Sequence, residues 1–143
     1  MKPLRLAYAS LSPEAYQGLV SVKKALEKSS LGNNLTELVY LRVSQINGCS
    51  FCLEMHSKSL REGGEKQSRL DAVAGWHVST HFTPRERAAL QWAESLARVA
   101  DTHAPDSDYE SLKAHFTDKE ISDLTFAVAL MSAFNRLAIG MRQ

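Results

Sequence analysis

The sequence predicts an all-α protein, a single-domain bundle of about six to seven helices over residues 1–143. Apolar residues recur in steps of three and four through most of the chain, which is the period of an amphipathic helix. Residues typical of helix N-termini stand before these periodic stretches. No stretch alternates between apolar and polar residues over the length of a strand. We therefore expect helices from end to end, with no linker or low-complexity segment.

The first two helices are predicted from their N-terminal signals. Ser12-Pro13-Glu14 places a capping serine before a proline at the first helical position. Four apolar residues then follow at helical spacing, Ala15, Leu19, Val22 and Leu26. Asn34, with Glu37 three residues on, is a variant of the capping box and predicts a second helix over residues 38–46.

Two further helices should follow the turn that Asn47-Gly48 indicates. We expect the third helix to begin close to Cys49 and to end at Gly63-Gly64, because glycine commonly terminates a helix. A shorter fourth helix is expected over residues 68–76.

The last helices have the clearest start signals. Thr83-Pro84-Arg85-Glu86 and Thr117-Asp118-Lys119-Glu120 are capping boxes that precede long periodic stretches. Between them, residues 105–116 are expected to form a short helix. Residues 121–139 are apolar on most sides, so this segment should be the central buried helix or an oligomer interface.

Composition and charge argue against several classes of function. The formal net charge of +1 gives no basic field, so nucleic acid is not the expected partner. The first ten residues contain no apolar segment of the secretory type. The most apolar run, Leu124–Phe134, has 11 residues, which is too short to span a bilayer. We expect a soluble cytoplasmic protein that acts without a membrane and without a bound cofactor.

The most informative motif is Cys49-Ser50-Phe51-Cys52, which contains the only two cysteines of the chain and is followed by His56. In the cytoplasm a C-x-x-C pair is more often catalytic or metal-binding than structural. The spacing suits a dithiol in which one sulfur attacks and its neighbour resolves the product. A zinc site that adds His56 and either Glu54 or Glu37 would combine residues from opposed helix faces, and inert thiols are the remaining alternative.

The expected helix start gives these residues a shared chemistry. Both sulfurs would lie in or beside the first turn, where free backbone N–H groups and the positive end of the helix dipole favour thiolate. Cys52 and His56 are four residues apart and share a helix face, so the imidazole can take the thiol proton.

Glu37 can be placed by counting residues. A tight turn at Asn47-Gly48 makes the second and third helices antiparallel neighbours, which brings Glu37 to within about one helical turn, roughly 5–6 Å, of the level of His56. A relay in the order Glu37, His56, Cys52 follows, in which Ser44 could bridge by its hydroxyl. The alternative is that Glu37 serves only as the acid of the Asn34 capping box.

Residues 37–56, from Glu37 through Cys49 and Cys52 to His56, closely resemble the core motif of AhpD-like alkylhydroperoxidases, which belong to the wider carboxymuconolactone decarboxylase family. Asn135-Arg136-Leu137, late in the last helix, is also similar. The resemblance implies an all-helical fold that assembles into homo-oligomers, either trimers or hexamers. It also implies peroxidase activity on hydroperoxides, with no cofactor or metal.

Carried over to this chain, the resemblance makes Cys52 the peroxidatic cysteine and Cys49 the resolving one, with Glu37 and His56 as the proton relay. The disulfide would be reduced again by an external dithiol, a lipoylated or thioredoxin-like protein. One departure is Phe51, because some family peroxidases have a histidine directly before the second cysteine. The absence of this histidine removes one group of the relay.

Two other functions compete with the peroxidase. A lactone decarboxylase of the same wider family needs no dithiol, so the intact C-x-x-C argues against it. A non-enzymatic, redox-responsive helical oligomer would form the disulfide without consuming peroxide.

Overall fold

The computed structural model describes residues 3–143, and every regular element in that range is a helix. The described residues contain nine α-helices and two 3₁₀ helices, slightly more than the six to seven helices expected. In chain order they are α1 (Tyr8–Leu11), α2 (Pro13–Glu27), α3 (Asn33–Asn47), α4 (Ser50–Glu62), α5 (Gln67–Ala72), η1 (Val73–Val78), α6 (Pro84–Ala97), α7 (Val99–Thr102), α8 (Asp106–Glu110), η2 (Ser111–Ala114) and α9 (Asp118–Met141).

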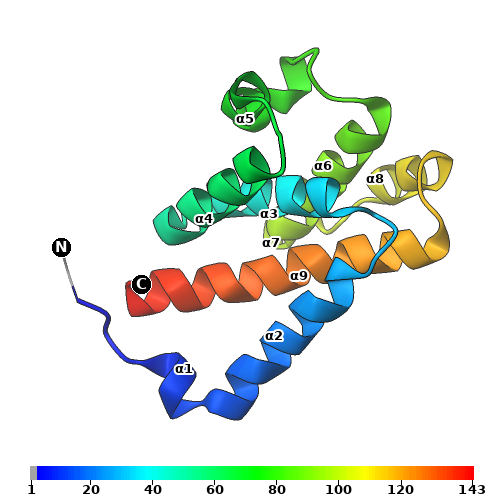
Figure 1. The fold of residues 1–143 in the computed structure, drawn as a ribbon. Helices are drawn as coiled ribbons and strands as arrows, with labels where there is room; N and C mark the ends of the chain where they lie inside the picture. The colour runs from blue at the N-terminus through cyan, green and yellow to red at the C-terminus, as the bar shows by residue number, and fades with distance from the viewer. Residues whose placement is uncertain (1–2) are drawn as a thin grey trace.

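The long helix α9 is the axis of the fold. It packs against α3 and α6, and its two flanks contact α2 and α4. Figure 1 shows α2 and α4 on opposite sides of α9, with α1 beside the C-terminal end of that helix. Leu124, Val128 and Met131 of α9 are buried in the main core, together with residues of α3 and α6. The expectation of a central buried helix is therefore confirmed.

A second, smaller core lies between α3, α4, α6 and the α5–η1 segment. Its largest members are Leu38, Leu41, Leu60, Trp76, Phe82 and Leu90. α3 contributes to both cores, and its residues 35–44 are buried except for Glu37. Packing on two sides thus fixes the helix that carries Glu37.

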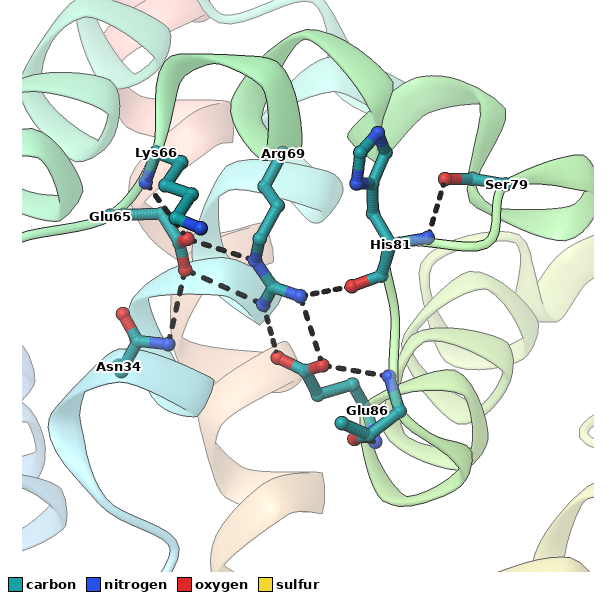
Figure 2. Close-up of polar contacts among 8 residues, drawn as sticks. Asn34, Glu65, Lys66, Arg69, Ser79, His81 and Glu86 are labelled. Carbon is teal, nitrogen blue, oxygen red and sulfur yellow. Dashed lines mark hydrogen bonds and ion pairs between the residues drawn. The ribbon is translucent and has the colours of Figure 1, made fainter.

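A network of charged groups ties α5 to its neighbours (Figure 2). The Arg69 guanidinium makes hydrogen bonds with the Glu65 and Glu86 carboxylates and with the backbone carbonyl of His81. Glu65 also accepts a hydrogen bond from Asn34 on α3. Arg69 therefore connects the start of α3, through Glu65, to the start of α6.

Most predicted helix starts agree with the structure. Both threonine capping boxes are present, at Thr83 and at Thr117. The expected third helix corresponds to α4, which begins after Cys49 and is followed by Gly63. The expected fourth helix is divided into α5 and the 3₁₀ helix η1, with non-helical dihedrals at Gly75.

The capping box proposed at Asn34 was wrong. α3 begins at Asn33 with Gly32 as its N-cap residue, and no side chain caps it. Asn34 lies inside the first turn and donates to Glu65 instead. The Glu37 carboxylate is therefore not occupied by capping the helix terminus.

By length and composition alone, α9 could cross a membrane, and it is the one such helix among residues 3–143. Buried helices of globular cores pass the same test, and Asp123 and Asn135 of α9 are both buried polar residues in this fold. Of the apolar window of α9, 39% is buried in this fold, in part by packing against α3 and α6.

Candidate active site

The turn between α3 and α4 sets the position of the first cysteine. Gly48 ends α3 in the left-handed conformation, with φ of 70°, which glycine adopts without strain. The Ser44 carbonyl accepts hydrogen bonds from the backbone N–H groups of both Gly48 and Cys49. Cys49 is then the N-cap residue of α4, and its sulfur accepts a hydrogen bond from the Cys52 N–H at 3.3 Å. Both sulfurs therefore lie at the positive end of α4, as expected.

Cys49 and Cys52 form a disulfide. Both residues are buried, with exposed fractions of 1% and 2%, and they pack against Ala138 of α9. The pair thus sits at the junction of α4 with the C-terminal part of α9.

The Glu37 carboxylate contacts the His56 imidazole directly, with 2.7 Å between Oε2 and Nδ1. The His56 side chain is 2% exposed and that of Glu37 is 19% exposed. An ionised carboxylate can only accept hydrogen bonds, so Nδ1–H is the donor. In the neutral ring the lone pair is then on Nε2, the tautomer suited to a general base.

The other ring nitrogen is free to react. His56 Nε2 is buried and has no hydrogen-bond partner among residues 3–143. The ring packs against Tyr40, with 5.3 Å between the ring centroids. Burial, followed by the charges of Glu37 and Glu27, raises the pKa of the Tyr40 phenol, so Tyr40 remains neutral beside the imidazole. Glu37 and Tyr40, both on α3, therefore hold the ring in place.

A cavity of about 220 Å³ opens onto Cys52 and His56. It is a groove over α9, between α4 and the N-terminal helices α1 and α2, whose position on opposite sides of α9 is visible in Figure 1. Its walls are mostly apolar and aromatic, and include Tyr8, Tyr16, Val20, Phe51, Met55, Met131 and Phe134. Lys23 places a charged side chain among the lining residues. The cavity can hold an apolar molecule with one polar group directed at the Cys52 sulfur.

A second cavity of about 150 Å³ lies beside Cys49, at the N-terminus of α4. Gly48, Ser50, Ile139 and Arg142 line it. Phe51, Ala138 and Gln143 line both cavities and so lie between them. Cys49 lines only the smaller cavity, whereas Cys52 and His56 line only the larger one.

Ser44 has a different role from the one suggested by the sequence. Its hydroxyl oxygen accepts a hydrogen bond from Asn135 Nδ2 at 3.1 Å and makes none with Glu37 or His56. Asn135 Oδ1 in turn accepts from Asn47 Nδ2 at 3.0 Å. Asn135 therefore joins α9 to the turn that precedes Cys49.

Asn135 and Tyr40 are the supporting residues that reasoning from the sequence missed. Asn135 is fully buried directly after the apolar run 124–134, and a buried amide at such a position indicates a specific polar contact. Tyr40 gave no such signal, because its spacing fits an ordinary core position. The contribution of α1 and α2 to the cavity also had no local signal.

Among residues 3–143, no group of three or more His, Cys, Asp or Glu side chains is arranged to hold a metal ion. The zinc alternative built on Cys49, Cys52 and His56 therefore has no support in the geometry.

Comparison with known proteins assigns the family. The sequence profile of the carboxymuconolactone decarboxylase family matches residues 13–95, more than half of the chain and all of the Glu37–His56 segment. The chain belongs to the carboxymuconolactone decarboxylase family. Within it, the chain is AhpD-like, as the resemblance of residues 37–56 predicted.

Relatives and solved structures support this assignment. The uncharacterised protein YdfG of Bacillus subtilis is 30% identical over 96% of this chain and 93% of its own length. The crystal structure of ATU0492 from Agrobacterium tumefaciens, a protein of unknown function suggested to be the antioxidant defence protein AhpD, is 37% identical. It superposes with a TM-score of 0.94 over 99% of this chain and 97% of that one.

A third structure is an uncharacterised peroxidase-related protein of Ralstonia eutropha, described as an alkylhydroperoxidase AhpD core. It is 27% identical to the present chain and superposes with a TM-score of 0.81, over 94% of the present chain and 73% of the Ralstonia chain. The fold and the family of the chain are thereby established.

Proposed function

We propose that this protein is a thiol peroxidase that reduces organic hydroperoxides through the Cys49–Cys52 pair. One observation carries the proposal. The Glu37–His56 pair, one helical turn beyond Cys52, leaves a buried imidazole nitrogen without a partner beside an apolar cavity. The antioxidant-related descriptions of similar structures agree with such an activity.

The oxidative step needs only groups in this cavity. His56 Nε2 accepts the proton of the Cys52 thiol, and the thiolate attacks the terminal oxygen of the hydroperoxide. The O–O bond breaks, the sulfur keeps one oxygen as sulfenic acid, and the alkoxide leaves as an alcohol with the proton from His56. The sulfur is oxidised by two electrons and the peroxide is reduced by two.

The resolving step uses the neighbouring thiol. The Cys49 sulfur attacks the Cys52 sulfenic acid, so that the S–S bond forms and water leaves. The hydrogen bond from the Cys52 N–H to the Cys49 sulfur, at the positive end of α4, favours the Cys49 thiolate that this attack requires. An external dithiol, on a lipoylated or thioredoxin-like protein, then restores both thiols.

The test separates the two sulfurs. We expect Cys52→Ser to abolish sulfenic acid formation on treatment with cumene hydroperoxide, whereas Cys49→Ser forms the sulfenic acid and accumulates it. Mass spectrometry of each treated variant checks this. Sulfenic acid found on Cys49 of the Cys52→Ser protein, with none in the converse variant, would exchange the two roles.

A steady-state assay tests the activity itself. Purified protein should consume hydroperoxide when it is supplied in turn with a lipoyl or a thioredoxin reducing system. Turnover should be lost on thiol alkylation, which a lactone decarboxylase would tolerate. Disulfide formation without catalytic consumption under either system would leave the redox-responsive oligomer instead.

A further inference from the structure

Each of the two cavities at the disulfide is lined by a different cysteine of the pair. The larger cavity is lined by Cys52 and His56, whereas the smaller one is lined by Cys49. Phe51 and Ala138 belong to both walls and separate the two openings. A molecule in one cavity therefore lies beside Cys52, and a molecule in the other lies beside Cys49.

Thiol–disulfide exchange has a strict geometry. The attacking thiolate approaches along the line of the S–S bond, from the side opposite the sulfur that leaves. Attack on Cys49 thus requires space on the side of Cys49 that faces away from Cys52. The smaller cavity provides space at Cys49, whereas the larger cavity leads only to Cys52.

We propose that the smaller cavity is the access site of the dithiol reductant, and that Cys49 is the sulfur it attacks. The inference rests on the peroxidase function proposed above and adds the route of the second substrate. The larger cavity then receives the hydroperoxide, so that oxidant and reductant reach the pair through different openings.

Reduction of the disulfide takes two successive exchange steps. A thiolate of the reductant bonds to the Cys49 sulfur, the S–S bond breaks, and Cys52 leaves as a thiolate that gains a proton through His56. The second thiol of the reductant then attacks its own sulfur in the mixed disulfide and releases Cys49. The reductant is oxidised to a disulfide, and the protein recovers two thiols.

Three features of the site support this direction of attack. The leaving sulfur is then Cys52, which lies one turn from His56, and a stabilised thiolate leaves faster. Arg142 places a positive charge at the smaller cavity, where it attracts the thiolate form of the reductant. Ala138 and Ile139 give the same cavity an apolar wall suited to the carbon chain of a dithiol.

A trapping experiment tests which sulfur is attacked. Oxidised wild-type protein is mixed briefly with 2-mercaptoethanol, a monothiol of which the first molecule forms a mixed disulfide and a second is needed to complete the reduction. The mixture is quenched with acid and the free thiols are alkylated with N-ethylmaleimide. Fragment ions that separate Cys49 from Cys52 should place the mercaptoethanol adduct on Cys49 and the maleimide on Cys52. The reverse pattern, or equal adducts on both, would overturn the proposal.

A pair of matched variants tests the route. Ser50 and Met55 are exposed residues of α4 that line the smaller and the larger cavity, respectively. Ser50→Trp should slow reduction of the disulfide by dihydrolipoamide by about tenfold or more, because the indole occupies the space that the attacking thiolate needs. Met55→Trp should instead slow the reaction of the reduced protein with cumene hydroperoxide. Circular dichroism verifies that both variants are folded.

The two half-reactions are measured separately, so the proposals can fail separately. Wild-type protein that does not react with peroxide would contradict the peroxidase function, while trapping and reduction would still report on the smaller cavity. Wild-type reduction rates in Ser50→Trp, or reduction slowed only in Met55→Trp, would contradict the reductant route alone.

Discussion

His56 lies at the centre of the candidate site, and its contact with Glu37 could be predicted from the sequence. The turn signal at Asn47-Gly48 made α3 and α4 antiparallel neighbours, so counting residues from the turn was enough to pair the two side chains. The structure brings them into direct contact at 2.7 Å. The Ser44 contact could not be found this way, because its partner Asn135 is 91 residues away on α9. Counting residues from a turn can predict contacts between two consecutive helices, but not contacts between helices that are far apart in the sequence.

The first prediction tests the relay at Glu37 and His56. His56→Ala should slow the reaction with peroxide by about 10²–10⁴-fold, the usual contribution of a general base. Glu37→Gln should slow it by about 10–100-fold, because Glu37 acts only by orienting the ring. Stopped-flow oxidation of the reduced protein measures both rates.

The serial order of the relay also predicts the rate of the double variant. The double variant should be little slower than His56→Ala alone, since members of one network are not additive. Glu54→Gln, which alters an exposed acid of α4, is the control and should match wild type. Two rate losses that multiply would exclude the serial order. A silent Glu37→Gln would exclude any role for the acid.

At the scale of elements, the C-terminal half of α9 positions the turn that presents Cys49. Asn135 donates to Ser44 and accepts from Asn47, and Ser44 holds the N–H groups of Gly48 and Cys49 through its carbonyl. The sequence predicted the helix from its capping box and apolar period, but not which face of α9 meets this turn.

The second prediction removes this connection. Asn135→Ala leaves the buried Ser44 hydroxyl without its donor, so the free energy of unfolding should fall by about 1–3 kcal/mol. Arg136→Ala, at the next and exposed position, is the control and should change it little. Urea unfolding measures both. Equal stability of the two variants would show that the Asn135 contacts do not stabilise the turn.

The third prediction concerns pH and the Arg69 network that fixes α5 (Figure 2). Burial raises the pKa of the Glu65 and Glu86 carboxyls, but hydrogen bonds from Arg69 and from the backbone lower it more, so both pKa values lie below their ordinary value. A lowered pKa stabilises the fold above the unfolded-state value, about 4.3, and this contribution is lost as the pH falls through the folded-state value.

Arg69→Met should therefore destabilise the protein by about 1–3 kcal/mol at neutral pH, and by less in acid. Lys58→Met removes an exposed ion pair with Glu62 and is the control, with an expected loss below about 1 kcal/mol. Urea unfolding at pH 7 and pH 3.5 gives the comparison. A loss for Arg69→Met that is equal at both pH values would exclude the carboxylates as its origin.

At the scale of the whole molecule, α3 and α6 cover only part of the apolar surface of α9, because the most apolar window of this helix is 39% buried. Exposed apolar side chains lie both on α9 and on other elements. They include Leu4, Leu6 and Leu11 near the N-terminus, Phe51 and Met55 beside the larger cavity, and Val78 and Phe126. The family resemblance still predicts a trimer or hexamer.

The fourth prediction is that the purified protein is such a homo-oligomer at micromolar concentration. Light scattering coupled to size-exclusion chromatography measures its mass. Leu6→Glu and Leu11→Glu should shift the mass downward if the N-terminal apolar residues lie in the contact, whereas Val99→Glu provides a charged substitution on another surface. A stable wild-type monomer would contradict the prediction.

The unpaired nitrogen of His56 has a consequence for the energetics of the redox cycle. In the disulfide form a buried Nε2 without a partner costs about 1–3 kcal/mol, and a Cys52 thiol can remove that cost by donating to it. A short disulfide loop stabilises a fold by a comparable amount, about 2 kcal/mol, in the chain-entropy account. The two effects oppose each other, so oxidised and reduced protein should unfold at similar temperatures. His56→Leu should leave the oxidised form the more stable of the two. The histidine that we propose as the base for the thiol would thus keep the disulfide from becoming a permanent cross-link.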